Sequence, residues 1–494
     1  MKKLIPLILI ITLLFTSCQL KGDFSIPEAS VSVTEEPATA LFTEYLSVTE
    51  TVTEEHTAAN IITAVSSSIA STLAAISPVK PSQPKTTVAA TERQTEKTTV
   101  KPTAKPTAVP TKATTKPATK PQTTAAPLIQ TELRGIWISC YDHISAAGKT
   151  REQYKASTDT MFRNIKNMGL DTAFVHLRAF SDAFYKSDIY PYSSYIAGTE
   201  GADLPFDPFA VMLESAKQYG ISVHGWINPF RVSTKNDPSL LSAKNPAKAI
   251  LDAGNENGEI CILSNGIYYN PSCPSNHGRI IDGVREIISK YDIDGIHIDD
   301  YFYPSTDSSV DKKQYSQYKA EGGTLGLADW RRSCVNAFVS ALYSAVKAAD
   351  STLTVSISPA GQLDKNYDEY YADCELWLSH AGYADLIIPQ IYFGFEHETL
   401  AFSSLLKKWS SLPRAAGVEL ACGIAAYKCA TTDKFAGTGS AEWKNKTDIL
   451  SRQLNAIRGN KNYGGFVVFS YQDLNRTACK TEINNLKNTI TGNS

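Results

Sequence analysis

Short apolar runs rich in β-branched residues alternate with helical patterns from Leu133 to the end of the chain. Such alternation is typical of parallel strands joined by crossover helices. The runs are "LRGIWIS", "TAFVHLR", "SVHGWIN", "DGIHID", "LTVSIS", "LIIPQIY", "ACGIAAY" and "GFVVFSY". We expect helices between them at 151–168, 208–219, 278–291, 330–349, 368–381, 399–410, 443–458 and near 481–490.

Eight strand–helix units in a row predict an α/β fold of the (β/α)₈ TIM-barrel type with enlarged loops. An open doubly wound sheet is the alternative architecture for such a pattern. Its usual glycine-rich phosphate loop is missing after the first strand, which favours the barrel.

The part of the chain before the barrel has a different composition. Residues 1–18 contain Lys2 and Lys3, an apolar run too short to span a bilayer comfortably, and small residues before Cys18, which predicts a secretory signal peptide. Residues 19–128 are rich in Thr, Pro, Ala, Lys and Ser, so they cannot bury enough apolar surface to fold and should form a disordered linker. We expect one folded domain over 129–494.

The ending "FTSC" of the signal resembles a bacterial lipobox, in which the cysteine becomes lipid-modified. This reading places lipidation at Cys18 and a lipid anchor at the extracellular face of the bacterial cytoplasmic membrane. The alternative is an ordinary cleaved signal with an incidental cysteine.

Net charge and cysteine spacing limit the partners, metals and disulfides that we expect. The formal charge of −2, with Lys and Arg dispersed, gives no reason to expect nucleic acid as a partner. The nine cysteines form no C-x-x-C and no His/Cys cluster with zinc spacing, so we expect no structural metal and no cofactor. Cys261 and Cys273 flank a probable hairpin and could pair, whereas Cys422 and Cys429, at two ends of one predicted strand and about 23 Å apart, could not.

The stretch "IDGIHIDDYFYP" carries two acids at the end of a buried strand. Burying neighbouring ionised carboxylates is costly, so Asp299 and Asp300 are either solvated or held there for chemistry. Active sites of TIM barrels lie at the carboxyl ends of the strands, which places both at the mouth. Because strand side chains alternate in direction, one is a candidate catalyst and the other its supporter.

The remaining strand ends and loops collect polar and aromatic side chains. Aromatic rings stack on the apolar faces of sugars while amides and charged groups bond their hydroxyls, so this set is typical of a carbohydrate site. Any single ring could instead belong to the upper core. The candidates for substrate binding are Arg178, Asn228, Arg231, Tyr301, Tyr303, Gln390, Tyr392, Tyr427 and Tyr471.

Seven motifs, in order, resemble those of the glycosyl hydrolase-like 10 family between about Leu133 and Asn475. They are "RGIWIS", "FVHLRAFSDAFYKSDIYPYSSYIAG", "FDPFAVMLESAKQYGISVHGWINPFRV", "DGIHIDDYFYP", "DWRR", "SISPAG" and "IIPQIYFGF". The resemblance implies a barrel hydrolase of the bacterial envelope, with peptide-free peptidoglycan glycan strands as the substrate class of one branch. One departure is Ala179 after Arg178, where the family more often has proline, which puts the shape of that loop in question.

The resemblance implies that the family's functional residues correspond in this sequence to Arg178, Asp182, Asn228, Arg231, Asp299, Asp300, Gln390 and Tyr392. A remoter similarity of "GIHID" to the fourth strand of the α-amylase clan implies that Asp299 is the nucleophile or base. Asp182 is the preferred general acid, and Glu396 is the alternative. Arg178 is expected to hold a carboxylate or bind a substrate acid group.

Two other readings stay open. One is a non-catalytic barrel that binds glycan, and the other is a metal-dependent deacetylase or amidase. His176, His224 and His297 lie within strands and are expected to be core histidines, although His224, His297 and Asp299 together could ligate a metal.

Overall fold

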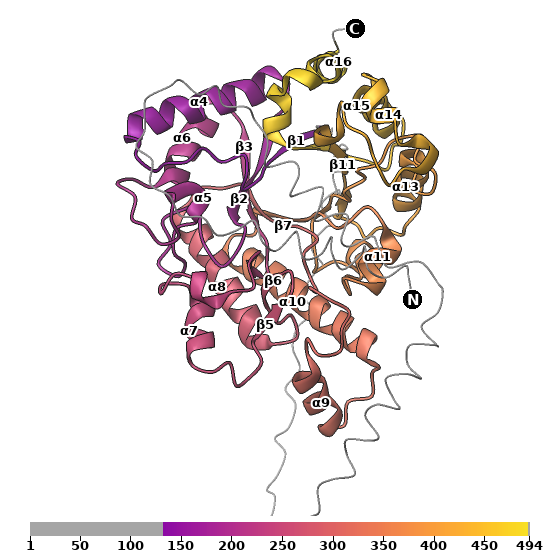
Figure 1. The fold of residues 1–494 in the computed structure, drawn as a ribbon. Coiled ribbons are helices and arrows are strands. Elements are labelled where there is room, and N and C mark those ends of the chain that lie inside the picture. Colours follow the sequence, from indigo (N-terminus) through magenta and orange to yellow (C-terminus); the bar gives the residue numbers. More distant parts are fainter. Residues whose placement is uncertain (1–131, 493–494) are drawn as a thin grey trace, which may run out of the picture. The chain divides into compact units, whose positions relative to one another are not determined.

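A computed structural model describes residues 132–492 of the chain (Figure 1). The predicted signal peptide, the lipidation site at Cys18 and the linker all lie outside the described residues. Within the described part, no helix has both the length and the apolar character needed to cross a membrane.

The main sheet is entirely parallel and confirms the predicted barrel. Its strands follow the order β10-β9-β8-β7-β3-β2-β1-β12-β11. The pairing of β1 with β12 and of β12 with β11 joins the first strand of the chain to its last two. A parallel bridge between Gln390, just after β9, and Gly423 of β11 closes the ring. The strands are β1 (Leu133–Ile138), β2 (Thr172–Arg178), β3 (Ser222–Ile227), β7 (Gly295–Ile298), β8 (Thr354–Ile357), β9 (Leu386–Ile387), β10 (Glu419–Leu420), β11 (Cys422–Ala425) and β12 (Gly465–Phe469).

Only Ala421 separates β10 from β11, and together they form the seventh strand of an eight-stranded barrel. All eight predicted runs therefore coincide with strands. Cys429 lies beyond β11, after a 3₁₀ turn at Ala426–Lys428, so the predicted single strand from Cys422 to Cys429 is too long.

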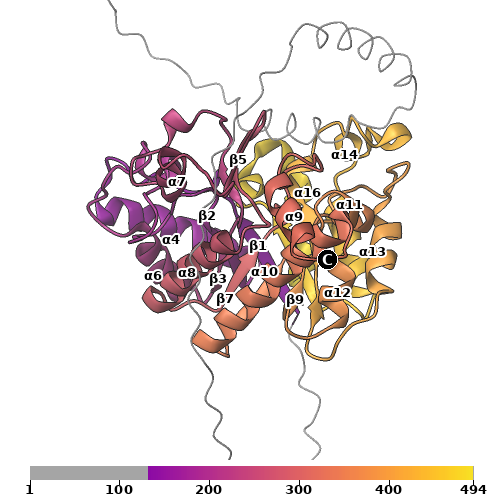
Figure 2. The ribbon, with the colours of Figure 1, turned by 90° about the horizontal axis from the view of Figure 1, so that it is seen from below.

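Helices surround the strands, as Figure 2 shows for α4, α6, α8 and α10 on one side and α12 and α13 on the other. Local signals set several of their ends. Thr150 and Gln153 form a capping box at the start of α4, while Asp207 caps α6, which ends at Gly220 with φ 61°. The helices that match predictions are α4 (Arg151–Asn167), α6 (Pro208–Tyr219), α8 (Pro274–Lys290), α10 (Leu327–Ala349), α13 (Phe402–Ser410) and α16 (Lys480–Thr491).

Two predicted helices are wrong in extent. The stretch 368–381 contains the end of α11 (Leu363–Asp368) and all of α12 (Cys374–Ser379), because Tyr371 between them has φ 53°. The stretch 443–458 divides into α14 (Glu442–Asn445) and α15 (Ile449–Arg458).

The break between α14 and α15 has a tertiary cause. The buried Glu482 carboxylate, on α16, accepts a hydrogen bond from the Leu450 amide at 2.5 Å and so satisfies a free N–H group at the start of α15. A residue distant in sequence therefore fixes where α15 begins. Three further helices lie in loops, namely α5 (Ser194–Ala197), α7 (Pro246–Asp252) and α9 (Lys312–Ala320).

A second, antiparallel sheet has the order β4-β6-β5. The predicted hairpin is confirmed as β5 (Ile260–Leu263) and β6 (Gly266–Tyr269), and β4 (Arg231–Ser233) adds a third strand that was not expected. Cys261 and Cys273 are free buried thiols, which donate to the carbonyls of Val310 and Gly258 respectively. All eight cysteines among residues 132–492, Cys429 and Cys479 included, are free thiols in the structure.

The barrel encloses its own apolar core. Its members are Trp137, Phe174, Trp226, Leu386, Ile388, Ala421 and Val467, and a larger core lies between the strands and the helices. Phe174 faces inward and Val175 outward, which is the alternation expected of β2.

His297 lies among these inner residues and is fully hydrogen-bonded. The Trp137 indole donates to its Nε2 at 3.0 Å, and its Nδ1 lies 2.9 Å from the Ser356 hydroxyl. Because an indole N–H can only donate, Nε2 accepts and the ring proton is on Nδ1. His297 is thus the expected core histidine. His176 and His224 are buried too, but both ring nitrogens of His176 and Nδ1 of His224 lack a hydrogen-bond partner within 132–492.

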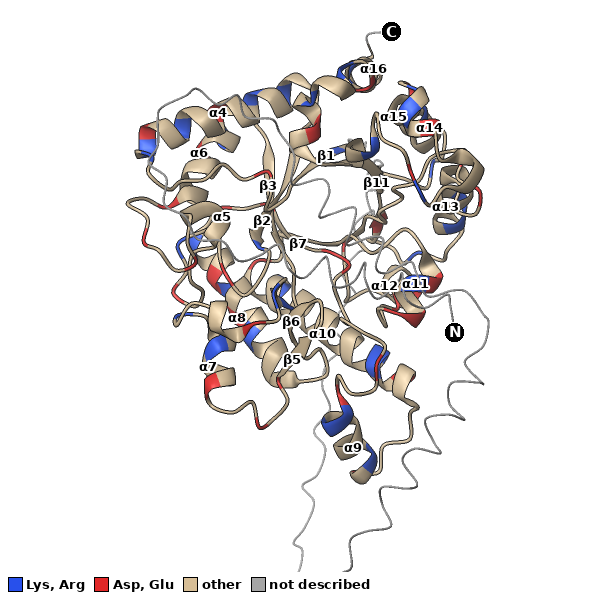
Figure 3. Cartoon of the chain, viewed as in Figure 1, with Lys and Arg blue, Asp and Glu red and all other residues tan. Residues whose placement is uncertain are grey.

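Charged residues of both signs are interspersed along the outer helices (Figure 3). One ion pair is instead fully buried. Arg331 of α10 binds both carboxylate oxygens of Asp311 at 2.7 Å, and it also donates to the carbonyls of Thr306 and Asp307 and to the Tyr371 hydroxyl. This arginine fixes the connection that follows β7.

Arg331→Met should lower the free energy of unfolding by about 3–5 kcal/mol, because it leaves the Asp311 carboxylate buried without its partner. The measurement is denaturant unfolding followed by circular dichroism. Arg285→Met serves as the control, since the Arg285–Asp282 pair is solvent-exposed and should contribute less than about 1 kcal/mol. Equal losses in the two variants would contradict this assignment.

Candidate active site

Asp299 and Asp300 lie together at the carboxyl end of β7 but take partners from different strands. The indole Nε1 of Trp226, on β3, donates to Asp299 Oδ2 at 3.1 Å. The side-chain amide of Gln390, after β9, donates to Asp300 Oδ1 at 3.1 Å and to the Ser358 carbonyl at 2.9 Å. Asp299 therefore points over the inner core that contains Trp226, while Asp300 points toward β8 and β9.

Burial makes both carboxyl groups hold their protons more strongly than usual. Burial and the neighbouring Asp300 raise the pKa of Asp299 well above its ordinary value, and the charge of Arg231 and the Trp226 hydrogen bond oppose this. Burial likewise raises the pKa of Asp300, against the Gln390 hydrogen bond and the charges of Lys365 and Arg231. Because two adjacent carboxylates repel, the pair loses its two protons in separate steps.

The charge of Arg231 lowers the pKa of both carboxyl groups of this pair. Its guanidinium carbon lies 4.4 Å from the centre of the Tyr301 ring and 5.0 Å from that of Phe180. The Asn228 side-chain oxygen accepts a hydrogen bond from the Arg231 amide at 3.2 Å and so shapes the turn that presents the arginine. The structure thus brings Arg231 and Tyr301 to the aspartate pair.

Asp182 lies on the loop after β2 and is 5 % exposed. Burial raises the pKa of its carboxyl group to about 7, against a hydrogen bond from Ser193 and the charge of Arg178, while Glu200 raises it further. Its Oδ1 has no hydrogen-bond partner in the described part of the chain. A carboxyl group that keeps its proton near neutral pH can act as a general acid.

Arg178 is buried below the mouth, where its hydrogen bonds go to backbone carbonyls and its charge acts on the Asp182 carboxylate, one of the two roles expected of it. It is 1 % exposed, and its guanidinium donates to the carbonyl oxygens of Asn228 at 2.7 Å and Pro229 at 3.1 Å. The pairing of β2 with β3 shifts between His176 and Arg178, so Arg178 pairs with the outward-facing Ile227. Its charge reaches Asp182, but its hydrogen bonds brace the loop after β3.

Asn228 is also fully buried. Its side-chain oxygen is used by Arg231, and its Nδ2 has no hydrogen-bond partner among residues 132–492. The Asn228 side chain therefore organises the turn under Arg231.

Glu396 lies apart from the buried acids. Its side chain is 52 % exposed and forms an ion pair with Lys446, and its backbone amide donates to Glu442 Oε2 at 2.8 Å. Glu396 is thus a solvent-exposed, ion-paired side chain, whereas Asp182 is buried, and this contrast favours Asp182 over Glu396 as the acid.

The predicted aromatic residues divide into two groups. Tyr392 meets Tyr427 edge-on with ring centres 5.9 Å apart, and the charges of Asp300 and Asp299 help burial to raise the Tyr392 pKa, which places this pair of rings by the acids. Tyr303 is 3 % exposed and its hydroxyl donates to Asp311 at 3.0 Å, so it belongs to the Arg331 cluster. The Tyr471 hydroxyl accepts a hydrogen bond from Asn164 of α4, on the outside of the barrel.

The sequence reading missed Trp226 and Lys365. Trp226 holds Asp299 and stacks on His176, with ring centres 3.7 Å apart and an angle of 5°. Its position two residues before Asn228, on the inward side of β3, is a signal that alternation could have supplied. Lys365 is on the short α11, whose approach to Asp300 has no local signal.

The metal alternative finds no support in these side chains. Within the described residues, no group of three or more His, Cys, Asp or Glu could hold a metal ion. Both ring nitrogens of His297 are engaged by Trp137 and Ser356, so this histidine is not available as a ligand beside Asp299.

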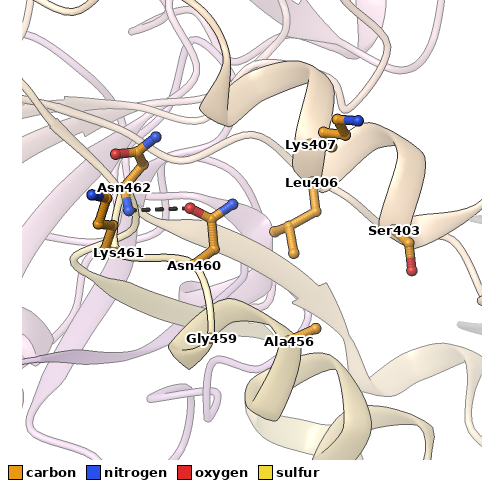
Figure 4. Close-up of a pocket in the computed structure, with 8 residues that line it drawn as sticks. All are labelled: Ser403, Leu406, Lys407, Ala456, Gly459, Asn460, Lys461 and Asn462. Atoms are coloured by element: carbon orange, nitrogen blue, oxygen red, sulfur yellow. Dashed lines mark hydrogen bonds between the residues drawn. The ribbon is translucent and has the colours of Figure 1, made fainter.

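Figure 4 shows a surface hollow of about 590 Å³ whose lining includes none of these acids. It is lined by one face of α13, by the end of α15 and by the loop that leads into the amino end of β12. Active sites of this fold lie at the carboxyl ends of the strands, so the hollow is not the candidate site.

The chain is similar in sequence to proteins of one family. The family model described as glycosyl hydrolase-like 10 matches residues 132–439. Glycosyl hydrolase YngK of Bacillus subtilis (strain 168) is 31 % identical over 367 residues, which cover 70 % of this chain and 69 % of that protein. Glycosyl hydrolase DigH of Escherichia coli (strain K12) is 26 % identical over 393 residues, or 72 % of this chain and 86 % of that protein.

Among solved structures, the catalytic domain of β-amylase from Paenibacillus polymyxa is 12 % identical and has a TM-score of 0.46. The match covers 74 % of this chain and 99 % of that domain.

Trp226→Phe should raise the pKa of Asp299 further, because it removes a hydrogen bond that stabilises the ionised carboxylate while keeping a ring that can stack on His176. The measurement is a titration of carboxyl ¹³C shifts in protein labelled at aspartate. Trp377→Phe is the matched control, since that indole donates to the uncharged Asn336. An Asp299 titration that is the same in wild type and Trp226→Phe would refute this assignment.

Proposed function

Because the chain belongs to the glycosyl hydrolase-like 10 family and is a glycosyl hydrolase-like enzyme, we propose that it cleaves envelope glycan strands of the peptidoglycan type, stripped of their peptides. The observation that carries the proposal is the pair of acids at the mouth, the buried Asp299 and the partly buried Asp300, with the buried Asp182 as a third acid of raised pKa. Glycoside cleavage usually needs two carboxyl groups in different protonation states.

In the proposed mechanism Asp299 attacks the sugar, or activates water to do so. Trp226 fixes Asp299 Oδ2, while Asp299 Oδ1 lies 3.5 Å from the Tyr301 amide nitrogen and can face the substrate. Asp300 supports Asp299 and is itself oriented by Gln390. The charge of Arg231 favours the ionised state that attack requires.

Asp182 would supply the proton that the leaving oxygen needs. Its carboxyl group is protonated below a pH of about 7, and desolvation of the site maintains that proton. Tyr301, Tyr392 and Tyr427 provide ring faces near the acids on which sugars can stack.

The proposed location rests on residues 1–128. A lipid-modified Cys18 followed by the Thr/Pro-rich segment would hold the barrel outside the bacterial cytoplasmic membrane, in reach of wall glycan. Fractionation of cells that produce Cys18→Ser tests this, because a protein without the anchor should leave the membrane fraction.

The test of function is incubation of the protein with peptide-free and with peptide-bearing peptidoglycan strands, with new reducing ends followed by mass spectrometry. We expect short sugars from the peptide-free strands, lost in Asp299→Asn and unaffected by a chelator. Binding without release would instead indicate a glycan-binding barrel. Release of acetate or peptide that a chelator stops would indicate a metal-dependent deacetylase or amidase.

Asp182→Asn should reduce kcat on these strands by about 10²–10⁴-fold, because it removes the general acid. It should also abolish the alkaline limb of the pH–rate profile. In the wild type that limb should fall near pH 7, since activity is lost as Asp182 gives up its proton. Glu396→Gln is the matched control and should keep both rate and limb. The reverse result, with Glu396→Gln inactive and Asp182→Asn active, would exclude Asp182 as the acid.

A further inference from the structure

Two cysteines distant in sequence, Cys429 and Cys479, lie side by side in the segments that follow β11 and β12. Cys429 follows the 3₁₀ turn Ala426–Lys428 that carries Tyr427, and Cys479 is the N-cap residue of α16. Both are buried, and the Cys479 thiol lies 3.4 Å from the Cys429 carbonyl oxygen, across a separation of 50 positions. Two segments that leave different strands, β11 and β12, therefore meet at these sulfur atoms.

Arg476 ties the same two segments together. Its Nε donates to the Cys479 sulfur at 2.8 Å. Its Nη2 donates to the carbonyl oxygens of Tyr427, at 3.1 Å, and of Cys429. The guanidinium thus holds one sulfur against the backbone that carries the other.

The surroundings shift the pKa values of the two thiols in opposite directions. Interaction with Cys429 and with Arg476 lowers the pKa of Cys479 to about 7, while interaction with Cys479 and burial raise the pKa of Cys429. A thiolate is the nucleophile in disulfide exchange, and a thiol with a pKa near the ambient pH attacks most effectively. Cys479 is suited to attack and Cys429 to complete the bond.

We propose that Cys429 and Cys479 form a disulfide that closes the segment between β11 and α16 and fixes the turn carrying Tyr427. The Cys479 thiolate attacks the disulfide of a donor, such as oxidised glutathione or a thiol oxidoreductase, and releases one donor thiol. Cys429 then loses its proton and displaces the second donor thiol from the mixed disulfide. Two protein thiols are oxidised to one disulfide, and one donor disulfide is reduced to two thiols.

Exchange fits a late stage of folding, when Arg476 has brought the two segments together but the sulfurs, which are buried in the folded protein, are still open to the donor. The other adjacent pair is less well arranged, since Cys261 and Cys273 donate to backbone carbonyls on different segments, Val310 and Gly258. The proposal therefore makes a selective prediction among the nine cysteines of the chain.

The experiment is refolding of the full chain in a mixture of reduced and oxidised glutathione, followed by alkylation and trypsin digestion without reduction. Trypsin should release "CATTDK" (429–434) joined to "TACK" (477–480), with a mass lower than their sum by two hydrogen atoms. Reduction of the folded protein should lower its Tm by about 5–10 °C, because a closed loop of this length constrains the unfolded chain.

Cys429→Ser and Cys479→Ser should each remove the joined peptide and the redox-dependent difference in Tm. Cys334→Ser, which changes a partly exposed thiol on α10, should retain both. Peptides 429–434 and 477–480 recovered singly and alkylated from the wild type would overturn the proposal, and so would Cys261 joined to Cys273 in their place. The wild-type digest decides the matter even where a serine variant fails to fold.

Discussion

Two carboxyl groups side by side at the end of an apolar strand are the constraint around which the mouth of this barrel is built. Burial raises the pKa of both Asp299 and Asp300, and groups from the surrounding strands oppose this rise. The Trp226 indole comes from β3, the Gln390 amide follows β9, and the Arg231 charge comes from β4. A closed ring of parallel strands allows this, because it brings the carboxyl ends of all strands to one face.

Two buried arginines hold the loops that carry these groups. Arg178 donates to the carbonyls of Asn228 and Pro229, just before Arg231, and Arg331 donates to those of Thr306 and Asp307, just after Tyr301. Neither arginine contacts the two aspartates through a described hydrogen bond. Both replace water as the partner of loop carbonyls, which lets irregular backbone be buried next to the site.

Much of the fold could be predicted from sequence because a closed parallel barrel makes each strand an apolar run of regular direction. The same regularity predicted that Asp299 and Asp300 could not share one direction, and they do take partners from opposite sides. Tertiary contacts decided the features that the local sequence pattern could not predict. The shift in pairing after His176 turns Arg178 outward, and the carboxylate of Glu482 decides where α15 begins.

The regular alternation of side chains in the barrel strands also predicted part of the site. Alternation and barrel topology placed Asp299, Asp300, Gln390 and Tyr392 together, but the sequence could not show that Tyr303 is bound to Asp311 or that Glu396 is paired with Lys446. Lys365 acts on Asp300 from a short helix with no strand position to reveal it. Roles that depend on which loop lies over which strand end become visible only in the folded chain.

The most direct test of the central claim is a crystal structure of the Asp299→Asn protein with a peptide-free glycan oligomer bound. The account predicts that the oligomer lies across the carboxyl ends of the strands, with one anomeric carbon against residues 299 and 300 and the linking oxygen toward Asp182. An oligomer bound elsewhere, or one whose sugar linkages all lie away from these residues, would contradict it.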